Sequence, residues 1–157
     1  MSVGWTEVIV DLSFEQLDLL VVASRLVCPA TGLDGPGVVG VRDGLIEFVE
    51  MGDGGSEYQA ARETLEVEDG ILLPGLIDLH AHPAASGSKF GIDADRDLMP
   101  KGSTTVLSQG DAGARNVDQY ISETIAGSRT TVKLALNFCA EGESNPAGRF
   151  FSLDEAN

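Results

Sequence analysis

The chain has 157 residues and a formal net charge of −15, from 25 Asp and Glu against 10 Lys and Arg. This charge argues against binding to nucleic acid and against docking on a membrane of anionic lipid. The hydrophobic fraction of 43% is ordinary for a folded soluble protein that buries a sizeable core. No apolar run approaches the about 20 residues of a membrane helix, and the N-terminus lacks the basic residues of a secretory signal. We therefore predict a cytoplasmic protein with two reduced cysteines, Cys28 and Cys139.

The first half of the chain has the pattern of short β-strands separated by turns. Residues 1–14 form an N-terminal extension whose partial alternation could add an edge strand. The clearest local prediction is a hairpin in which Asp43–Gly44 is the tight turn. Residues 15–73 are predicted to be one small β domain. Its strand-like runs lie at 17–27, 37–43 and 45–50, with a Gly- and Pro-rich turn at 28–37, a polar connection at 51–63, and another strand before Asp69–Gly70.

Residues 74–157 have a different pattern, and the change falls near Pro74. Strand-like runs at 103–111 and 129–138 alternate with helical patterns at 91–102 and 114–128. The order β-α-β-α-β is typical of parallel strands joined by crossover helices. We therefore predict an α/β unit in the second half of the chain.

The stretch LPGLIDLHAHP, residues 73–83, contains both histidines of the chain, His80 and His82. Alternate residues of a strand point the same way, so the two imidazoles are predicted to project together from a strand end. Neutral imidazole is the commonest metal ligand among side chains, and two of them make half of a zinc-type site. The alternative is a pair that merely caps a strand and meets solvent, since H-x-H alone is a short motif. The preceding β domain and the following βα units favour the metal site.

The same stretch resembles the first barrel strand of the amidohydrolase superfamily of metal-dependent hydrolases. Residues 18–50 resemble the small β-sandwich that flanks the barrel in that family. Residues 91–116 are similar to the branch of dihydroorotase-like deacetylases and N-acyl-D-amino-acid deacylases. The resemblance implies an α/β fold in which an N-terminal β-sandwich precedes the first βα units of an incomplete TIM (β/α)8 barrel.

The resemblance also implies a divalent metal centre of one or two ions, most simply Zn2+, with His80 and His82 binding the first ion. In the family, a carboxylated lysine, two further histidines and a catalytic aspartate come from later strands. The metal lowers the pKa of bound water to about 7 and polarises the carbonyl that this water attacks. The implied substrate is a small amide or ester, such as an N-acyl amino acid.

Other polar residues follow the predicted strands of the second half. Asp111 and Asn137 would lie at strand ends on the catalytic face, where each is either substrate-facing or an ordinary loop residue. Asp78 lies on the His80 face by parity, where it would orient a neighbouring histidine or be a buried polar residue.

The chain contains no third histidine, and residues 74–157 supply only about three of the barrel's eight strands. Of the lysines, Lys133 is the least poor match to the family's bridging lysine, because Lys89 and Lys101 lie in polar loops. We therefore expect an N-terminal fragment of a longer hydrolase, with the catalytic aspartate beyond Asn157. Two alternatives stay open: a non-catalytic binding or assembly module, and an inactive truncated product with an incomplete metal site. An open barrel exposes a strand edge, which predicts self-association into a homo-oligomer.

Overall fold

The computed structural model describes residues 16–52 and 61–144. The predicted extension at 1–14, the middle of the polar connection at 53–60, and residues 145–157 lie outside this description. The chain divides between Pro74 and Gly75 into two units, which are treated separately below. No helix in the described ranges is long and apolar enough to cross a membrane.

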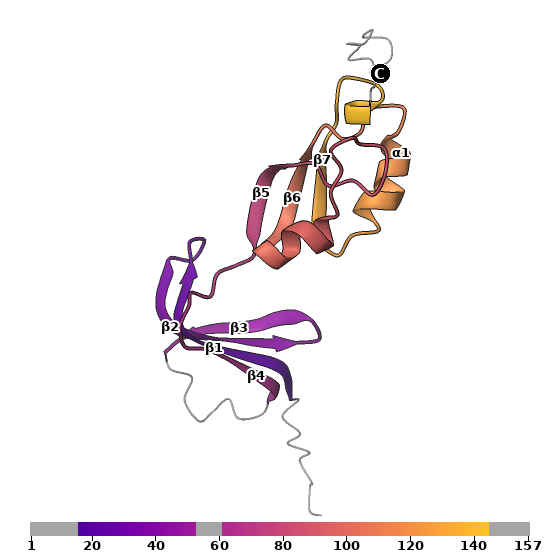
Figure 1. Cartoon of the computed structure of the whole chain (residues 1–157). Helices are drawn as coiled ribbons and strands as arrows, with labels where there is room; N and C mark the ends of the chain where they lie inside the picture. The colour runs from indigo at the N-terminus through magenta and orange to yellow at the C-terminus, as the bar shows by residue number, and fades with distance from the viewer. Residues whose placement is uncertain (1–15, 53–60, 145–157) are drawn as a thin grey trace, which may run out of the picture. The chain divides into compact units, whose positions relative to one another are not determined.

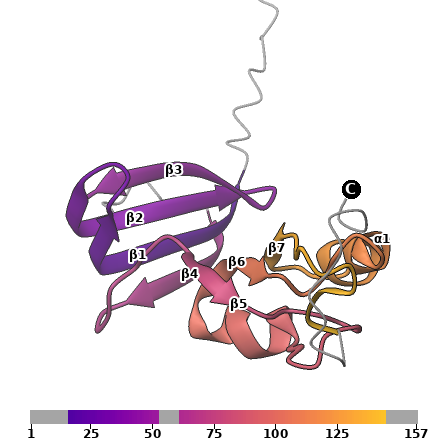
Figure 2. The ribbon, with the colours of Figure 1, turned by 90° about the horizontal axis from the view of Figure 1, so that it is seen from above.

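The first unit is a four-stranded mixed sheet with the order β3-β2-β1-β4 (Figures 1 and 2). β1 is antiparallel to β2 and parallel to β4, and β2 is antiparallel to β3. The predicted β-sandwich requires a second sheet, whereas the described strands of this unit all belong to one sheet. The observed architecture is therefore a single sheet. Its strands are β1 (Leu17–Cys28), β2 (Leu33–Arg42), β3 (Leu45–Met51) and β4 (Ala61–Val67).

One face of this sheet packs around Leu20, Val38 and Phe48. Gly40 pairs with both Leu20 and Phe48 across the strands. A Cβ atom at Gly40 would lie 2.2 Å from Cε1 of the Phe48 ring, so the glycine makes room for the aromatic side chain. The register between strands is thereby fixed by side-chain packing as well as by the ladder.

The predicted hairpin at 38–50 is confirmed by the β2–β3 pair. Arg42 pairs with Leu45, which leaves a two-residue turn. Both turn residues have positive φ, 50° at Asp43 and 73° at Gly44. These signs define the primed turn whose twist matches that of the flanking strands.

Replacing Gly44 by alanine is expected to destabilise the first unit by about 1–2 kcal/mol, because an L-residue with a Cβ is strained at this φ. Asp43→Asn is the matched control, since asparagine tolerates the left-handed region and should leave stability nearly unchanged. Urea unfolding of both variants measures the difference. Equal stability of the two variants would contradict the turn assignment.

The second unit is a three-stranded parallel sheet with the order β5-β6-β7 (Figure 1). The predicted helical regions at 91–102 and 114–128 lie between these strands, so the predicted β-α-β-α-β order is confirmed. Gly102, at φ 93°, ends the first helical region, as predicted. The elements are β5 (Leu76–Ala81), η2 (Ala94–Leu98), η3 (Met99–Lys101), β6 (Ser103–Gln109), α1 (Val117–Tyr120), η4 (Ile121–Ile125), β7 (Thr131–Ala135) and η5 (Gly142–Ser144).

The helices cover one face of this sheet. Val106 and Val132, which pair across β6 and β7, are 0% and 3% exposed and pack with Ala94 and Tyr120 from the helices. Ile77 and Leu79 of β5 are instead 65% and 68% exposed. The sheet therefore has one packed face and one open face, and its three described strands agree with the predicted first βα units of an incomplete barrel.

Candidate functional site

The two histidines lie at the carboxyl end of β5, with His80 inside the strand and His82 just after it. Their ring centroids are 5.5 Å apart and the rings meet edge to face. His80 is exposed, and the side chain of His82 is 26% exposed. The structure thus brings both imidazoles together at a strand end.

A bulge in β5 places His80. Asp78 pairs with Val106 and Ala81 pairs with Ser108, so Leu79 and His80 lie opposite a single residue of β6. This shift of register interrupts the simple alternation on which the expected common face of Asp78 and His80 rested. The Asp78 carboxylate accepts the backbone N–H of His80 at 3.0 Å, and so orients that histidine through its backbone.

Asp111 lies beyond the end of β6 and is the most buried carboxylate near the histidines, at 1% exposure. Its Oδ1 contacts Nδ1 of His82 at 3.2 Å and accepts the hydroxyl of Ser88 at 2.7 Å. Its Oδ2 accepts the hydroxyl of Ser108 at 2.6 Å. A buried carboxylate is tolerated only with such partners, and here both oxygens have them. Asp111 and His82 are therefore in direct contact, and two serine hydroxyls hold the Asp111 carboxylate in place.

Tyr120 of α1 closes the buried side of this network. Its hydroxyl donates to the carbonyl oxygen of Pro83, directly after His82, and the residue is 4% exposed. Burial raises the pKa of Tyr120 to about 12, and the nearby Asp111 carboxylate adds to that rise while a hydrogen bond with Ser108 opposes it. The phenol is thus held neutral beneath the histidine loop.

This raised pKa predicts a loss of stability at alkaline pH. The unfolded chain ionises Tyr120 near pH 10 and the folded chain near 12, so the stabilisation is complete below about pH 10 and is lost as pH rises to about 12. The expected decrease is about 2–3 kcal/mol, because the shift is about two units and each unit corresponds to about 1.4 kcal/mol. Unfolding across this range measures it. Tyr120→Phe should remove the decrease, and the same slope in Tyr120→Phe would contradict the assignment.

Asn137, the other predicted substrate-facing residue, lies just beyond β7. Its Nδ2 donates to the carbonyl of Gly110 at 3.0 Å, and its Oδ1 accepts the backbone N–H of Cys139 at 2.8 Å. Both ends of the amide therefore hold backbone together between the segments that follow β6 and β7. Asn137 therefore supports the loops around Asp111 through hydrogen bonds to their backbone.

The described residues offer an incomplete metal site. Within 16–52 and 61–144, no group of three or more His, Cys, Asp or Glu side chains is arranged to hold a metal ion. His80 and His82 fit two positions of such a site, since their rings are adjacent and the contact of His82 with Asp111 engages only Nδ1. Lys133 of β7 is exposed, at a position paired with Leu107.

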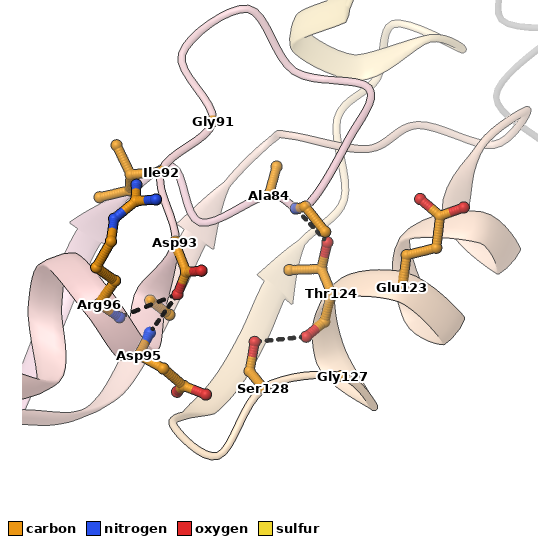
Figure 3. A pocket seen from close by; sticks show the side chains of 12 residues that line it. Ala84, Gly91, Ile92, Asp93, Asp95, Arg96, Glu123, Thr124, Gly127 and Ser128 are labelled. Carbon is orange, nitrogen blue, oxygen red and sulfur yellow. Dashed lines mark hydrogen bonds between the residues drawn. The ribbon is translucent and has the colours of Figure 1, made fainter.

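A separate cleft of about 430 Å³ lies beside the helices, and neither histidine lines it (Figure 3). Asp93 accepts the backbone N–H groups of Asp95 and Arg96 and so begins η2. Thr124 accepts the N–H of Ala85 across the cleft at 3.0 Å. Thr124 therefore holds the segment after β5 against the helices, whereas Asp93 caps η2.

Comparison with known proteins finds enzymes that are similar to part of the chain. No family model matches it. A deacetylase of Agrobacterium fabrum is 31% identical over 90 residues, which cover 56% of this chain and 22% of that protein. The chain spans about a fifth of the length of the curated relatives it matches. Over part of its length, the chain is similar to enzymes of the amidohydrolase superfamily.

Solved structures show the same fold. A dihydroorotase superposes with a TM-score of 0.68 at 22% identity, covering 88% of this chain and 37% of that one. An N-acyl-D-glutamate deacylase from Bordetella bronchiseptica, solved with zinc and a phosphonate inhibitor, superposes with a TM-score of 0.55 at 21% identity and covers 78% and 29%. These likenesses extend over most of the chain but only a minor part of each enzyme.

Three residues of the site were missed by sequence reasoning: Ser88, Ser108 and Tyr120. Ser108 lies three residues before Asp111, so the spacing in Ser-Gln-Gly-Asp was an available signal. Ser88 and Tyr120 reach the network from a loop and from a helix. No local sequence pattern indicates such contacts, because they depend on tertiary packing.

Proposed function

We propose that this chain supplies the first strands and the first two metal ligands of a metal-dependent amidohydrolase. The proposed reaction is hydrolysis of a small amide or ester, with an N-acyl amino acid as the substrate class. The single observation that carries the proposal is the adjacent His80–His82 pair at the carboxyl end of the first strand of a parallel sheet. Chemistry of parallel α/β barrels takes place at that end of the strands.

The histidine environment supports metal binding over a merely solvated pair. A ligand histidine ordinarily donates its second ring N–H to a carboxylate or carbonyl, and His82 contacts Asp111 in this way. The similarity to a deacetylase and the zinc-containing deacylase structure support the choice of metal and reaction class. His80 and His82 would hold the ion, and remaining ligands would come from outside the described residues. Such an ion supplies activation of water and polarisation of the carbonyl.

Metal titration tests the proposal on the 157-residue chain. Isothermal titration with Zn2+ and absorption spectroscopy with Co2+ should show weak binding of one ion per chain, because only two imidazoles are available. Hydrolysis of N-acetyl amino acids is assayed in parallel, and the chain alone is expected to be inactive. Turnover would require a complete site within this chain. Absence of any histidine-dependent metal binding would contradict the proposal and favour a non-catalytic module.

A further inference from the structure

We propose that Asp111 is a positioning residue that keeps the proton of His82 on Nδ1 and leaves the lone pair on Nε2 free for a metal ion. This inference rests on the proposed metal-binding function of the histidine pair. It differs from the sequence-based expectation, in which Asp111 faces the substrate. It also assigns Ser88 and Ser108 a shared role as braces of the carboxylate.

The direction of the hydrogen bonds follows from chemistry. An ionised carboxylate only accepts, so the hydroxyls of Ser88 and Ser108 both donate to Asp111. The contact between Oδ1 and Nδ1 of His82 then requires the histidine nitrogen to be the donor. In a neutral imidazole, a proton on Nδ1 leaves Nε2 as the acceptor. The tautomer is therefore set by Asp111.

The burial of Asp111 argues for positioning and against direct contact with metal or substrate. Its side chain is 0% exposed, whereas that of His82 is 26% exposed. Both carboxylate oxygens are engaged by groups from elsewhere in the second unit. Contact with a metal at the histidines would require Asp111 to leave its serine partners. The carboxylate thus acts through the His82 ring.

The segment after β5 is shaped to deliver Ser88 to this carboxylate. Ile92 donates its N–H to the carbonyl of His82 at 3.0 Å, and Ala84 donates to the carbonyl of Ile92 at 3.1 Å. Residues 82–92 thereby form a loop whose two ends lie together. Ser88 lies within this loop, and its hydroxyl also accepts the N–H of Phe90. Asp111 is therefore contacted from three segments, by Ser88 of the loop, Ser108 of β6 and His82 after β5.

Histidine tautomers are read directly by nitrogen NMR of the metal-free chain at about pH 8, where free imidazole is neutral. His82 is expected to be the Nδ1–H tautomer, assigned by comparison with His82→Gln. In Asp111→Asn the neutral amide accepts more weakly, so the ratio of tautomers should move toward Nε2–H by about tenfold. His80, which Asp78 contacts through the backbone, is the internal reference and should not change. An Nε2–H tautomer of His82 in the unmodified chain would overturn the inference.

Metal affinity provides the second readout. Co2+ binding to Asp111→Asn should weaken by about 10–100-fold, the effect of losing a partner behind a ligand histidine. His80→Gln should weaken Co2+ binding while leaving the His82 tautomer unchanged. If the unmodified chain binds no metal yet His82 is the Nδ1–H tautomer, the proposed function fails and the positioning geometry stands. If metal binds equally well to Asp111→Asn, the positioning role fails and the proposed function stands.

Discussion

Replacing either His80 or His82 by alanine is expected to lower the affinity of the chain for Zn2+ by more than about 100-fold. Loss of an outer-shell partner costs about 10–100-fold, and loss of a ligand itself removes one of only two imidazoles. The ring centroids lie 5.5 Å apart, so one ion can draw on both rings and neither variant retains a pair. Isothermal titration with Zn2+ measures the change.

Lys133→Met is the matched control for this experiment. Lys133 is exposed in β7, in the same parallel sheet. By sequence it matches the family's metal-bridging lysine better than Lys89 or Lys101 does. Its substitution should leave zinc affinity unchanged if the two histidines alone provide the ligands within this chain. A loss comparable with that of His80→Ala would instead assign the lysine to the site. Retention of affinity in both histidine variants would remove the basis for a metal centre.

Replacing Asp111 by alanine is expected to reduce the free energy of unfolding of the second unit by about 3–5 kcal/mol. The substitution leaves the hydroxyls of Ser88 and Ser108 and the Nδ1–H of His82 without their acceptor. Each buried polar group left unpaired costs about 1–3 kcal/mol, and Ser108 is 0% exposed. The effect on stability should therefore be among the largest of any single polar substitution in this unit.

Chemical denaturation followed by circular dichroism measures this loss. Asp118→Ala, which removes an exposed carboxylate from α1, is the control and should change stability by less than about 0.5 kcal/mol. Asp111→Asn keeps the shape and part of the hydrogen bonding, so its loss should be intermediate. An Asp111→Ala chain as stable as the control would show that the buried network contributes nothing net.

Elements with strong local signals could be predicted from the sequence. The Asp43–Gly44 turn and the alternation of strands and helices after Pro74 depend on neighbouring residues alone, and both are observed. β2 begins earlier than the sequence predicts, because the composition of the Gly- and Pro-rich run at 28–37 is typical of a turn. In the structure Leu33 already pairs with Cys28, so only the residues between them turn.

The site was only partly predictable, because some of its contacts join residues that are far apart in the sequence. The proximity of His80 and His82 follows from their spacing, whereas the bulge beside Asp78 depends on pairing with β6. Asp111 lies 29 residues from His82, and its burial is decided by packing against a loop and a helix. A single sequence carries no local mark of such contacts.

The parallel pairing of β5 with β6 has a consequence for the order of events during synthesis. Leu76 pairs with Ser103, so β5 leaves the ribosome long before its partner strand exists. Closing that loop costs entropy before the ladder contributes stability. His80 and His82 are neighbours from the moment they are made, yet the second acquires its hydrogen-bond partner only after Asp111 has emerged. Exchange of amide protons in β5 of stalled nascent chains should therefore slow only once the chain extends well past Asp111.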